Sequence, residues 1–460
     1  MRIERSLNFR SLAIGLAFAT CTFLRADTVD DYIRAQMIWE QIPGLSIAVV
    51  KDGKVVRMEG YGFANLENNT AATPATVYRI GSVSKQFLAA GMMLLVEEGK
   101  VGLDDPVSKF INHTPLTWKE ITVRRLLSHT SGIVGESPGF NPMKAQSDLD
   151  VIRATFPLPL DFVPGSKWEY SNVNYYCVAE IIRKVTGEPW SKFIAERIFK
   201  PVDMTSTRTT TVSEIVPNRA SGYATGEDGL RNAEVWKALR PSGAFMSTVS
   251  DLVKWDASLD TDHILNAESR KAMWTPVRLN DKNSYPYGFG WLVNDVNGHQ
   301  RLRHPGGVRG FVAEFDRFPD DRISVIIMAN IENRDLSDLA AKIAGYYDAA
   351  LEPSLPPPIP DKSPDVTTRI RSIINGLASG SLDKEQFAPK LASQLSMQMN
   401  SGAFKPLARL GPMDSLEVTS SEKNADATHY KYRVTYKGIS LSAHCSLSNE
   451  GKILMFVLSN

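Results

Sequence analysis

Two strand-rich regions lie far apart in this chain, and a mostly helical region separates them. Near the start, the apolar, β-branched runs 45–51 and 54–60 flank Asp52-Gly53, a pair typical of a type I′ hairpin. Strand patterns return at residues 287–295, 301–304, 311–318 and 323–329. We therefore predict an α/β (α+β) fold with one antiparallel sheet built from both ends, flanked by helices and interrupted by a large helical insertion. A cleft between sheet and insertion is the expected site.

A proline-rich stretch divides the chain into parts. Residues 352–365 contain six prolines, five of them between residues 353 and 360, a composition typical of an extended linker. Before it, residues 27–351 form the predicted main domain. After it, residues 366–460 read as helices followed by alternating strands, which predicts a small α+β domain. We find no paired catalytic residue types there, so its role stays open.

The first 26 residues differ in composition from the rest of the chain. Arg2, Arg5 and Arg10 precede the apolar run 12–19, and Ala26 offers a small residue for cleavage. This pattern is typical of a secretory signal peptide and is too short for a spanning helix. A membrane anchor is the alternative. We expect a periplasmic or secreted protein without a stable membrane span.

Charge and cysteine content exclude several classes of function. The net charge of +1 gives no support for nucleic acid as a partner. Without the predicted signal only Cys177 and Cys445 remain, in different predicted domains, so we expect no disulfide. Seven scattered histidines show no metal-ligand spacing. We expect no metal and no cofactor, and the oligomeric state stays open.

Ser82 and Lys85 lie three residues apart at the start of a long apolar pattern that ends at Gly99. Residues with this spacing share a helix face, about 5–6 Å apart at Cβ. A lysine with its usual pKa of about 10.4 accepts a proton from serine only where its charged form is disfavoured. The same Ser-x-x-Lys pattern also occurs at Ser381 and Ser420, in polar surroundings. A helix N-cap is the alternative for Ser82.

Two further short patterns follow in the chain. Tyr170-Ser171-Asn172 lies between a Pro-Gly turn and a helical pattern, and His304-Pro305-Gly306-Gly307 is expected to end one late strand and turn toward the next. Taken singly, each has a structural alternative: Tyr170 as a buried aromatic and Asn172 as a helix cap.

Taken in order, these three patterns resemble those of the serine β-lactamase and penicillin-binding-protein family, in its class C β-lactamase, DD-carboxypeptidase and esterase branch. The stretch 127–132 also resembles one common in that family, and the resemblance covers roughly residues 28–350. It implies a β-lactamase/transpeptidase-like fold and a serine hydrolase.

The resemblance also implies roles for the residues. Ser82 would be the nucleophile that forms an acyl-enzyme. Lys85 and Tyr170 would share acid and base chemistry, with Lys85 keeping the Tyr170 phenol near its ionised state. Asn172 would orient Lys85 and bind substrate, and the backbone N–H groups of Ser82 and Gly307 would form the oxyanion hole. His304, Gly306 and Gly307 would contact substrate.

The third pattern departs from the family, whose β-lactamases usually carry Lys-Thr-Gly where this chain has His304-Pro305-Gly306. A histidine is mostly neutral near pH 7, so a charge that meets the substrate carboxylate is missing. Arg303 or Arg309 are candidates to supply it. Histidine here resembles the esterase, D-amino-acid peptidase and mitochondrial β-lactamase-like members, which makes efficient β-lactam hydrolysis the less favoured activity.

A rival nucleophile pattern occurs at Gly135-Glu136-Ser137-Pro138-Gly139. In a G-x-S-x-G elbow the residue after serine donates its N–H to the oxyanion, and proline has none. We therefore interpret this segment as a loop that rims the cleft.

Two functions follow from the sequence. The first is a secreted serine hydrolase that forms an acyl-Ser82 intermediate with an ester, amide or D-amino-acid peptide, so its partners are small-molecule or peptide substrates. The second is a non-catalytic peptidoglycan- or partner-binding protein that retains the fold.

Overall fold

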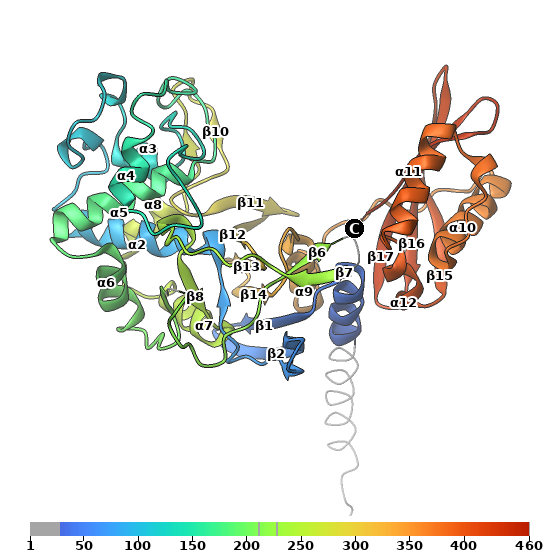
Figure 1. The fold of residues 1–460 in the computed structure, drawn as a ribbon, viewed down its shortest axis with the longest axis horizontal. Helices are drawn as coiled ribbons and strands as arrows, with labels where there is room; N and C mark the ends of the chain where they lie inside the picture. Colours follow the sequence, from blue (N-terminus) through green and yellow to red (C-terminus); the bar gives the residue numbers. More distant parts are fainter. Residues whose placement is uncertain (1–27, 210–211, 227–228, 460) are drawn as a thin grey trace, which may run out of the picture. The chain divides into compact units, whose positions relative to one another are not determined.

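The computed structural model describes residues 28–209, 212–226 and 229–459 (Figure 1). The signal peptide expected at residues 1–26 lies outside this described part. Contacts divide the described residues into two compact units. The larger comprises residues 43–226 and 230–353, and the smaller comprises residues 28–42, residue 229 and residues 354–459. No helix of the described residues is long and apolar enough to cross a membrane.

A seven-stranded antiparallel sheet forms the centre of the larger unit. Asp52 and Gly53 both adopt positive φ (52° and 71°), as a type I′ hairpin requires. The last strand of the unit pairs with the first, Leu45 opposite Ala329, so the sheet joins both ends as expected. The strands, in spatial order, are β11 (Leu292–Val296), β12 (His299–Val308), β13 (Phe311–Phe318), β14 (Ile323–Ala329), β1 (Gly44–Lys51), β2 (Lys54–Asn65) and β3 (Thr70–Ala71).

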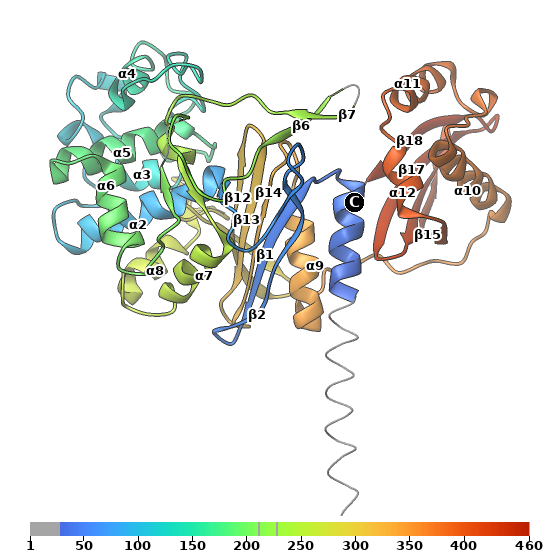
Figure 2. The same cartoon turned by 60° about the horizontal axis from the view of Figure 1, so that its bottom comes forward.

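Helices cover both faces of this sheet. In Figure 2, α9 (Ser337–Tyr347) lies on one side and the helical region lies on the other. Every residue of β13 and β14 is buried as a result. The helices of the insertion are α2 (Ser84–Glu97), α3 (Val123–Leu127), α4 (Asp148–Arg153), α5 (Asn172–Thr186), α6 (Trp190–Ile194), α7 (Val249–Ser258) and α8 (Ala267–Met273). Short strands complete the unit: β4 (Tyr78–Arg79), β5 (Arg208–Thr209), β6 (Tyr223–Gly226), β7 (Gly229–Asn232), β8 (Phe245–Ser247), β9 (Val277–Arg278) and β10 (Ser284–Tyr285).

Helix α2 is the buried axis of the helical region. Its residues from Ser84 to Leu95 are all buried, which fits an apolar pattern on every face. The Phe87 ring packs against Phe199, Phe245 and Trp255, with ring centroids 5.0–5.8 Å apart. Gly99 follows the helix with φ of 67° and ends it, as the sequence predicts. This packing holds the first turn of α2, and the residues just before it, in one position.

The smaller unit contains the C-terminal residues and a four-stranded antiparallel sheet. Residues 28–42, assigned to the main domain by sequence, group with this unit because Asp31 pairs with Lys437 and the backbone of Asp31 lies against Gly438. Part of the expected linker also joins it, since the Ile359 N–H donates to the carbonyl of Val418. Its elements are α10 (Pro364–Ser379), α11 (Pro389–Asn400), α12 (Lys405–Leu410), β15 (Met413–Lys423), β16 (Ala427–Tyr436), β17 (Ile439–Ser448) and β18 (Ile453–Ser459).

Candidate active site

Ser82 lies in a short 3₁₀ turn, η1 (Gly81–Val83), directly before α2. Neither η1 nor α2 has a side-chain cap at its N-terminus, so the capping alternative for Ser82 is wrong. Gly81 adopts φ of 50°, in the left-handed region that favours glycine. A Cβ on Gly81 would lie 2.6 Å from the Gly307 nitrogen, so only glycine permits η1 to approach strand β12 this closely.

Lys85 lies fully buried one helical turn beyond Ser82. Its Nζ lies 3.1 Å from Ser82 Oγ, 2.9 Å from Asn172 Oδ1 and 3.0 Å from the Ser242 carbonyl oxygen. Burial, followed by the charge of Arg240, holds the pKa of Lys85 well below its usual value. A neutral amine has two N–H donors and one lone pair. Because the amide and carbonyl oxygens only accept, they take both donors, which leaves the lone pair for the Ser82 hydroxyl.

Tyr170 lies beside this pair, with its ring centroid 4.6 Å from Lys85 Nζ. Its ring also packs 4.4 Å from that of His129. Burial raises the pKa of the Tyr170 phenol above its usual value, against a smaller lowering by its hydrogen bond with Ser82. This direction is opposite to the near-ionised phenol implied by the family resemblance. The protonated phenol favours Lys85 as the first base and Tyr170 as a proton donor.

Asn172 is the first residue of α5, and Ser171 caps that helix by accepting from the Asn174 N–H. The capping alternative for Asn172 is therefore wrong. Its Oδ1 accepts from Lys85, while its Nδ2 donates to Glu136 Oε1 at 2.5 Å. These two contacts fix the orientation of the amide, so Asn172 holds Lys85 as the sequence predicts.

The motif containing His304 lies in the last five residues of β12, so it ends that strand as expected, but the strand continues to Val308 and the turn follows only at Arg309 and Gly310. Gly306 pairs with Ala313 and Gly307 with Val312 of the next strand. The reason is the edge position of this segment. Pairing with β11 stops at Arg303, so a proline just beyond it interrupts no ladder on that side.

The register of β12 directs the Gly307 backbone toward η1. Val296 and His299 close the two-residue turn to β11, so odd-numbered residues of β12 direct their N–H and C=O groups away from β13. Gly307 is odd-numbered and lies past the end of β11, against Gly81. Gly306 fits only as glycine, because a Cβ there would lie 2.0 Å from the Ile80 carbonyl oxygen. This geometry is what an oxyanion donor at Gly307 requires.

His304 is buried within a chain of hydrogen bonds. The Ser171 N–H donates to His129 Nδ1 (3.2 Å), so His129 carries its proton on Nε2 and donates to the Tyr287 hydroxyl (3.2 Å). Tyr287 then donates to His304 Nε2 (3.1 Å), and His304 Nδ1 donates to the Pro305 carbonyl (2.6 Å). Burial lowers the pKa of His304 to about 3. His304 is therefore a neutral side chain with both ring nitrogens occupied.

The arginines suggested for the missing charge both have carboxylate partners. Arg303 pairs with Glu314 (2.8 Å), and Arg309 pairs with Glu332 (3.1 Å). A different arginine, Arg240, lies at the site and forms an ion pair with Glu136. Sequence reasoning missed it because Arg240 lies 70 residues beyond Tyr170, in no recognisable motif.

Glu136 was also missed, although its loop was noticed. That loop is the Gly-x-Ser-x-Gly segment, whose Ser137 is buried and donates to the Val151 carbonyl at 2.6 Å. Ser137 is thus structural. The neighbouring Glu136 contacts Asn172 and Arg240, so the loop borders the site as we inferred.

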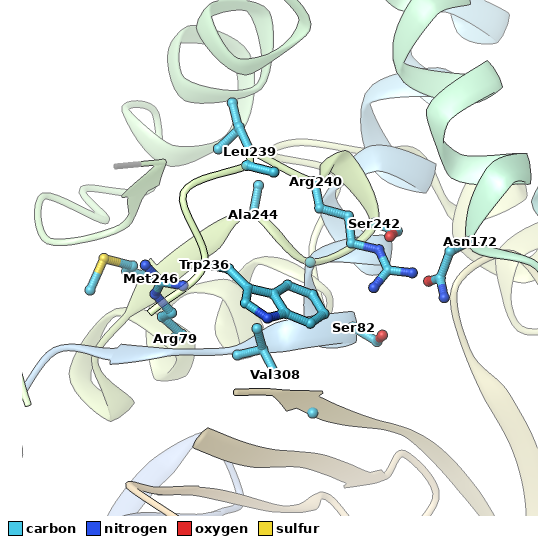
Figure 3. A pocket seen from close by; sticks show the side chains of 13 residues that line it. Arg79, Ser82, Asn172, Trp236, Leu239, Arg240, Ser242, Ala244, Met246 and Val308 are labelled. Atoms are coloured by element: carbon cyan, nitrogen blue, oxygen red, sulfur yellow. The ribbon is translucent and has the colours of Figure 1, made fainter. Parts of the chain in front are cut away.

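Two hollows meet at Ser82. A pocket with an empty volume of about 630 Å³ lies on one side, lined by Ser82, Asn172, Trp236, Arg240, Ser242 and Arg79 among others (Figure 3). A wider groove of about 1740 Å³ lies on the other, lined by Tyr170, Trp168, Tyr287, His304 and Gly306 among others. Gly307 and Val308 border both.

Comparisons with known sequences agree with this geometry. Residues 29–347 match the family model described as Beta-lactamase. Protein flp of Staphylococcus aureus (strain COL) is 28% identical over 319 residues, which are 66% of this chain and 63% of that protein. Penicillin-binding protein 4* of Bacillus subtilis (strain 168) is 28% identical over 309 residues, 62% of this chain and 68% of that protein. The chain thus spans less than two thirds of flp.

Solved structures share the fold. A penicillin-binding protein homologue from Pyrococcus abyssi, described as octameric, aligns over 95% of this chain and 100% of its own, with a TM-score of 0.66 and 22% identity. The D-amino acid amidase of Ochrobactrum anthropi SV3, complexed with L-phenylalanine, aligns over 71% of this chain and 98% of its own, with a TM-score of 0.61 and 25% identity.

Proposed function

Because this chain belongs to the β-lactamase family, we propose that it is a serine hydrolase that forms an acyl-enzyme at Ser82 with an ester, an amide or a D-amino-acid peptide. The observation that carries the proposal is the position of Lys85 Nζ, 3.1 Å from Ser82 Oγ and within hydrogen-bond distance of two acceptors, Asn172 Oδ1 and the Ser242 carbonyl, that can take both N–H groups of a neutral amine. A neutral amine held in this way is a base for the serine hydroxyl.

The first half of the reaction follows from these contacts. Lys85 accepts the Ser82 proton as Oγ attacks the carbonyl carbon, and the carbonyl oxygen becomes an anion. The backbone N–H groups of Ser82 and Gly307 stabilise that anion. The carbon–leaving-group bond then breaks, and the proton passes to the leaving group through Tyr170, whose phenol lies beside both Lys85 and Ser82.

The second half repeats these roles with water. A water molecule in the groove attacks the acyl carbon and gives its proton to the neutral Lys85, directly or through Tyr170, which passes its own proton on to Lys85; Ser82 then leaves with the proton that Lys85 has accepted. The neutral, buried His304 offers no cation to a carboxylate in the groove. This favours ester, amide and D-amino-acid peptide substrates over β-lactams, and the similarity to a D-amino acid amidase supports the amide class. Export of the protein remains a prediction from residues 1–26.

A covalent probe tests the proposal. We expect purified protein to react with a fluorescent fluorophosphonate, and Ser82→Ala to lose the adduct because Ser82 Oγ is the nucleophile. Ser137→Ala is the matched control, since Ser137 lies in the rival motif and has a structural role. Equal labelling of wild type and Ser82→Ala, or no labelling of folded wild type, would support instead the non-catalytic binding protein.

A further inference from the structure

The pocket and the groove at Ser82 hold different parts of a substrate. The proton donor for the leaving group, Tyr170, lines the groove and not the pocket. A general acid must lie within hydrogen-bond reach of the group that it protonates. The leaving group therefore lies in the groove, and the acyl group extends past Asn172 into the pocket. Whatever the pocket recognises is thus a property of the acyl group.

Arg240 projects into this pocket, and its ion pair with Glu136 does not use all of its N–H donors. Figure 3 shows its guanidinium directed toward Asn172 and Ser82, beside the Trp236 ring. The guanidinium carbon lies 4.9 Å from the Phe140 ring and 5.8 Å from the Trp236 ring, which fixes its plane. Within the described residues, Arg240 Nε is buried and has no hydrogen-bond partner.

A second unpartnered polar group lies in the same pocket. Ser242 is 1% exposed, and its Oγ has no hydrogen-bond partner among the described residues. Buried polar atoms are nearly always hydrogen-bonded in native proteins, because an unmade bond costs about 1–3 kcal/mol. Both atoms belong to residues that line one pocket, where an acceptor on a ligand can complete them.

Arg79 adds an uncompensated charge to the lining. In the part of the chain that is described, its guanidinium has no ion pair and no hydrogen bond to a side chain or carbonyl. Burial and the nearby Arg219 both lower the pKa of Arg79, so the charged neighbour that acts on it is another cation. Figure 3 shows Arg79 on the far side of Trp236 from Ser82.

The net charge of the side chains at the pocket favours binding of an anion. Glu136 opposes Arg240, but its carboxylate is not part of the lining and already accepts from Arg240 and Asn172. Arg79 and Arg240 therefore leave one positive charge beyond what Glu136 balances. At Lys85, too, the influence of Arg240 exceeds that of Glu136.

We propose that this pocket binds a carboxylate carried on the acyl group of the substrate, through Arg240 and the Ser242 hydroxyl and with Arg79 as a second cation. The inference rests on the proposed function, because an acyl group is defined only by a reaction at Ser82. It places the anion on the opposite side of Ser82 from His304. The preferred substrates are accordingly esters or amides of a dicarboxylic or acidic acyl group.

Three 4-nitrophenyl esters with one leaving group test this inference: the hexanoate, the adipate monoester and the 6-aminohexanoate. We expect wild type to hydrolyse the adipate with a kcat/KM at least 10-fold above that of the hexanoate, after subtraction of background hydrolysis. Arg240→Gln should lose that preference, read as the ratio of the two kcat/KM values within the variant, because Arg240 also lowers the pKa of Lys85 and its loss can change the rate on every ester. The exposed Arg322, paired at the surface with Asp52, gives the matched control Arg322→Gln.

Arg79→Gln provides a second variant, because it removes a cation that has no partner to disrupt. We expect it to lower the adipate preference while thermal unfolding stays unchanged. Equal rates on adipate and hexanoate in a wild type that reacts with fluorophosphonate would overturn the inference and leave the proposed function standing. A preference for the aminohexanoate that disappears in Glu136→Gln would overturn it in favour of a cation site. No reaction at Ser82 with any probe would overturn the proposed function itself.

Discussion

The two sides of Ser82 are built on opposite electrostatic principles. Lys85 beside Ser82, and Tyr170 and His304 on the groove side, are all titratable, and burial favours the neutral form of each. On the pocket side, Arg240 and Glu136 form an ion pair at the rim. Proton transfer needs groups that exchange protons easily, whereas recognition of an ion needs a fixed charge. The difference separates chemistry from recognition within a single site.

Burial alone does not explain this separation. Arg240 is 16% exposed at its side chain and Glu136 is 53% exposed, so water still solvates the pair. Lys85 is 0% exposed, and its hydrogen-bond partners among the described residues are two acceptors and a hydroxyl. A protonated amine there would lack a carboxylate to balance it. Solvent access to the Arg240–Glu136 pair, and the buried position of Lys85 without a carboxylate partner, therefore distinguish the two kinds of group.

The largest effect is expected from Lys85→Met, which removes the base and keeps the apolar stem. We expect kcat/KM toward an ester to fall by about 10²–10⁴-fold, the usual contribution of general acid–base catalysis. Wild-type activity should also fall as pH drops through the lowered pKa of Lys85, because only the neutral amine accepts the Ser82 proton. A pH–rate profile of both proteins measures this.

Lys85→Met also tests the direction in which the stability of the wild type changes with pH. Below pH 10 the unfolded chain holds a proton on Lys85 that the folded protein releases, so folding becomes less favourable as pH falls. This pH dependence continues down to the pKa of Lys85 in the folded protein. We expect the stability of Lys85→Met relative to wild type to rise by about 1.4 kcal/mol for each pH unit lowered within that window. A difference independent of pH would mean that Lys85 stays charged, and the contrast between the two sides of Ser82 would fail.

A smaller effect, on geometry, is expected from Gly306→Ala. The new Cβ would lie 2.0 Å from the Ile80 carbonyl oxygen, so β12 must move away from η1. Overpacking of this kind costs about 1–3 kcal/mol of stability, measured by denaturant unfolding. Gly307→Ala is the matched control for stability, because nothing lies within 4 Å of a Cβ there. Equal unfolding midpoints for the two variants would show that β12 does not hold the two hollows apart.

The sequence predicted the neutral side of the site far better than the charged side. Ser82 and Lys85 share a helix face by spacing alone, and Tyr170-x-Asn172 directly precedes a helix whose start is visible in the sequence. Arg240 and Glu136 meet only through folding, since 104 residues separate them. No local pattern marks an arginine whose role depends on such a contact.

Elements of the fold differ in the same way. The strands at residues 311–318 and 323–329 agree with their expected bounds, because buried apolar runs have few other ways to fold. Pro305-Gly306-Gly307 suggested a turn, since proline and glycine usually interrupt strands. Here they form the part of β12 that lies beyond the end of β11 and has no strand beside it on that side. Close approach to η1 requires glycine there. Local propensity could not reveal where the neighbouring strand ends.

The smallest effect on activity is expected from the titration of His304. Its pKa of about 3 keeps it neutral throughout the working range, so His304→Asn should leave the shape of the pH–rate profile between pH 5 and 8 unchanged.

The free energy of unfolding should depend on the titration of His304 instead. The unfolded histidine binds a proton below about pH 6.5 and the folded one does not, so wild type loses stability as pH falls from 6.5 toward 3. His304→Asn should lose less over that interval, by up to about 1.4 kcal/mol per pH unit, in denaturant unfolding. His113→Asn is the matched control, because His113 takes no part in this network. A change in activity near pH 6.5 that is present in wild type and absent only from His304→Asn would show that His304 carries a charge in the working enzyme. Both sides of Ser82 would then be charged.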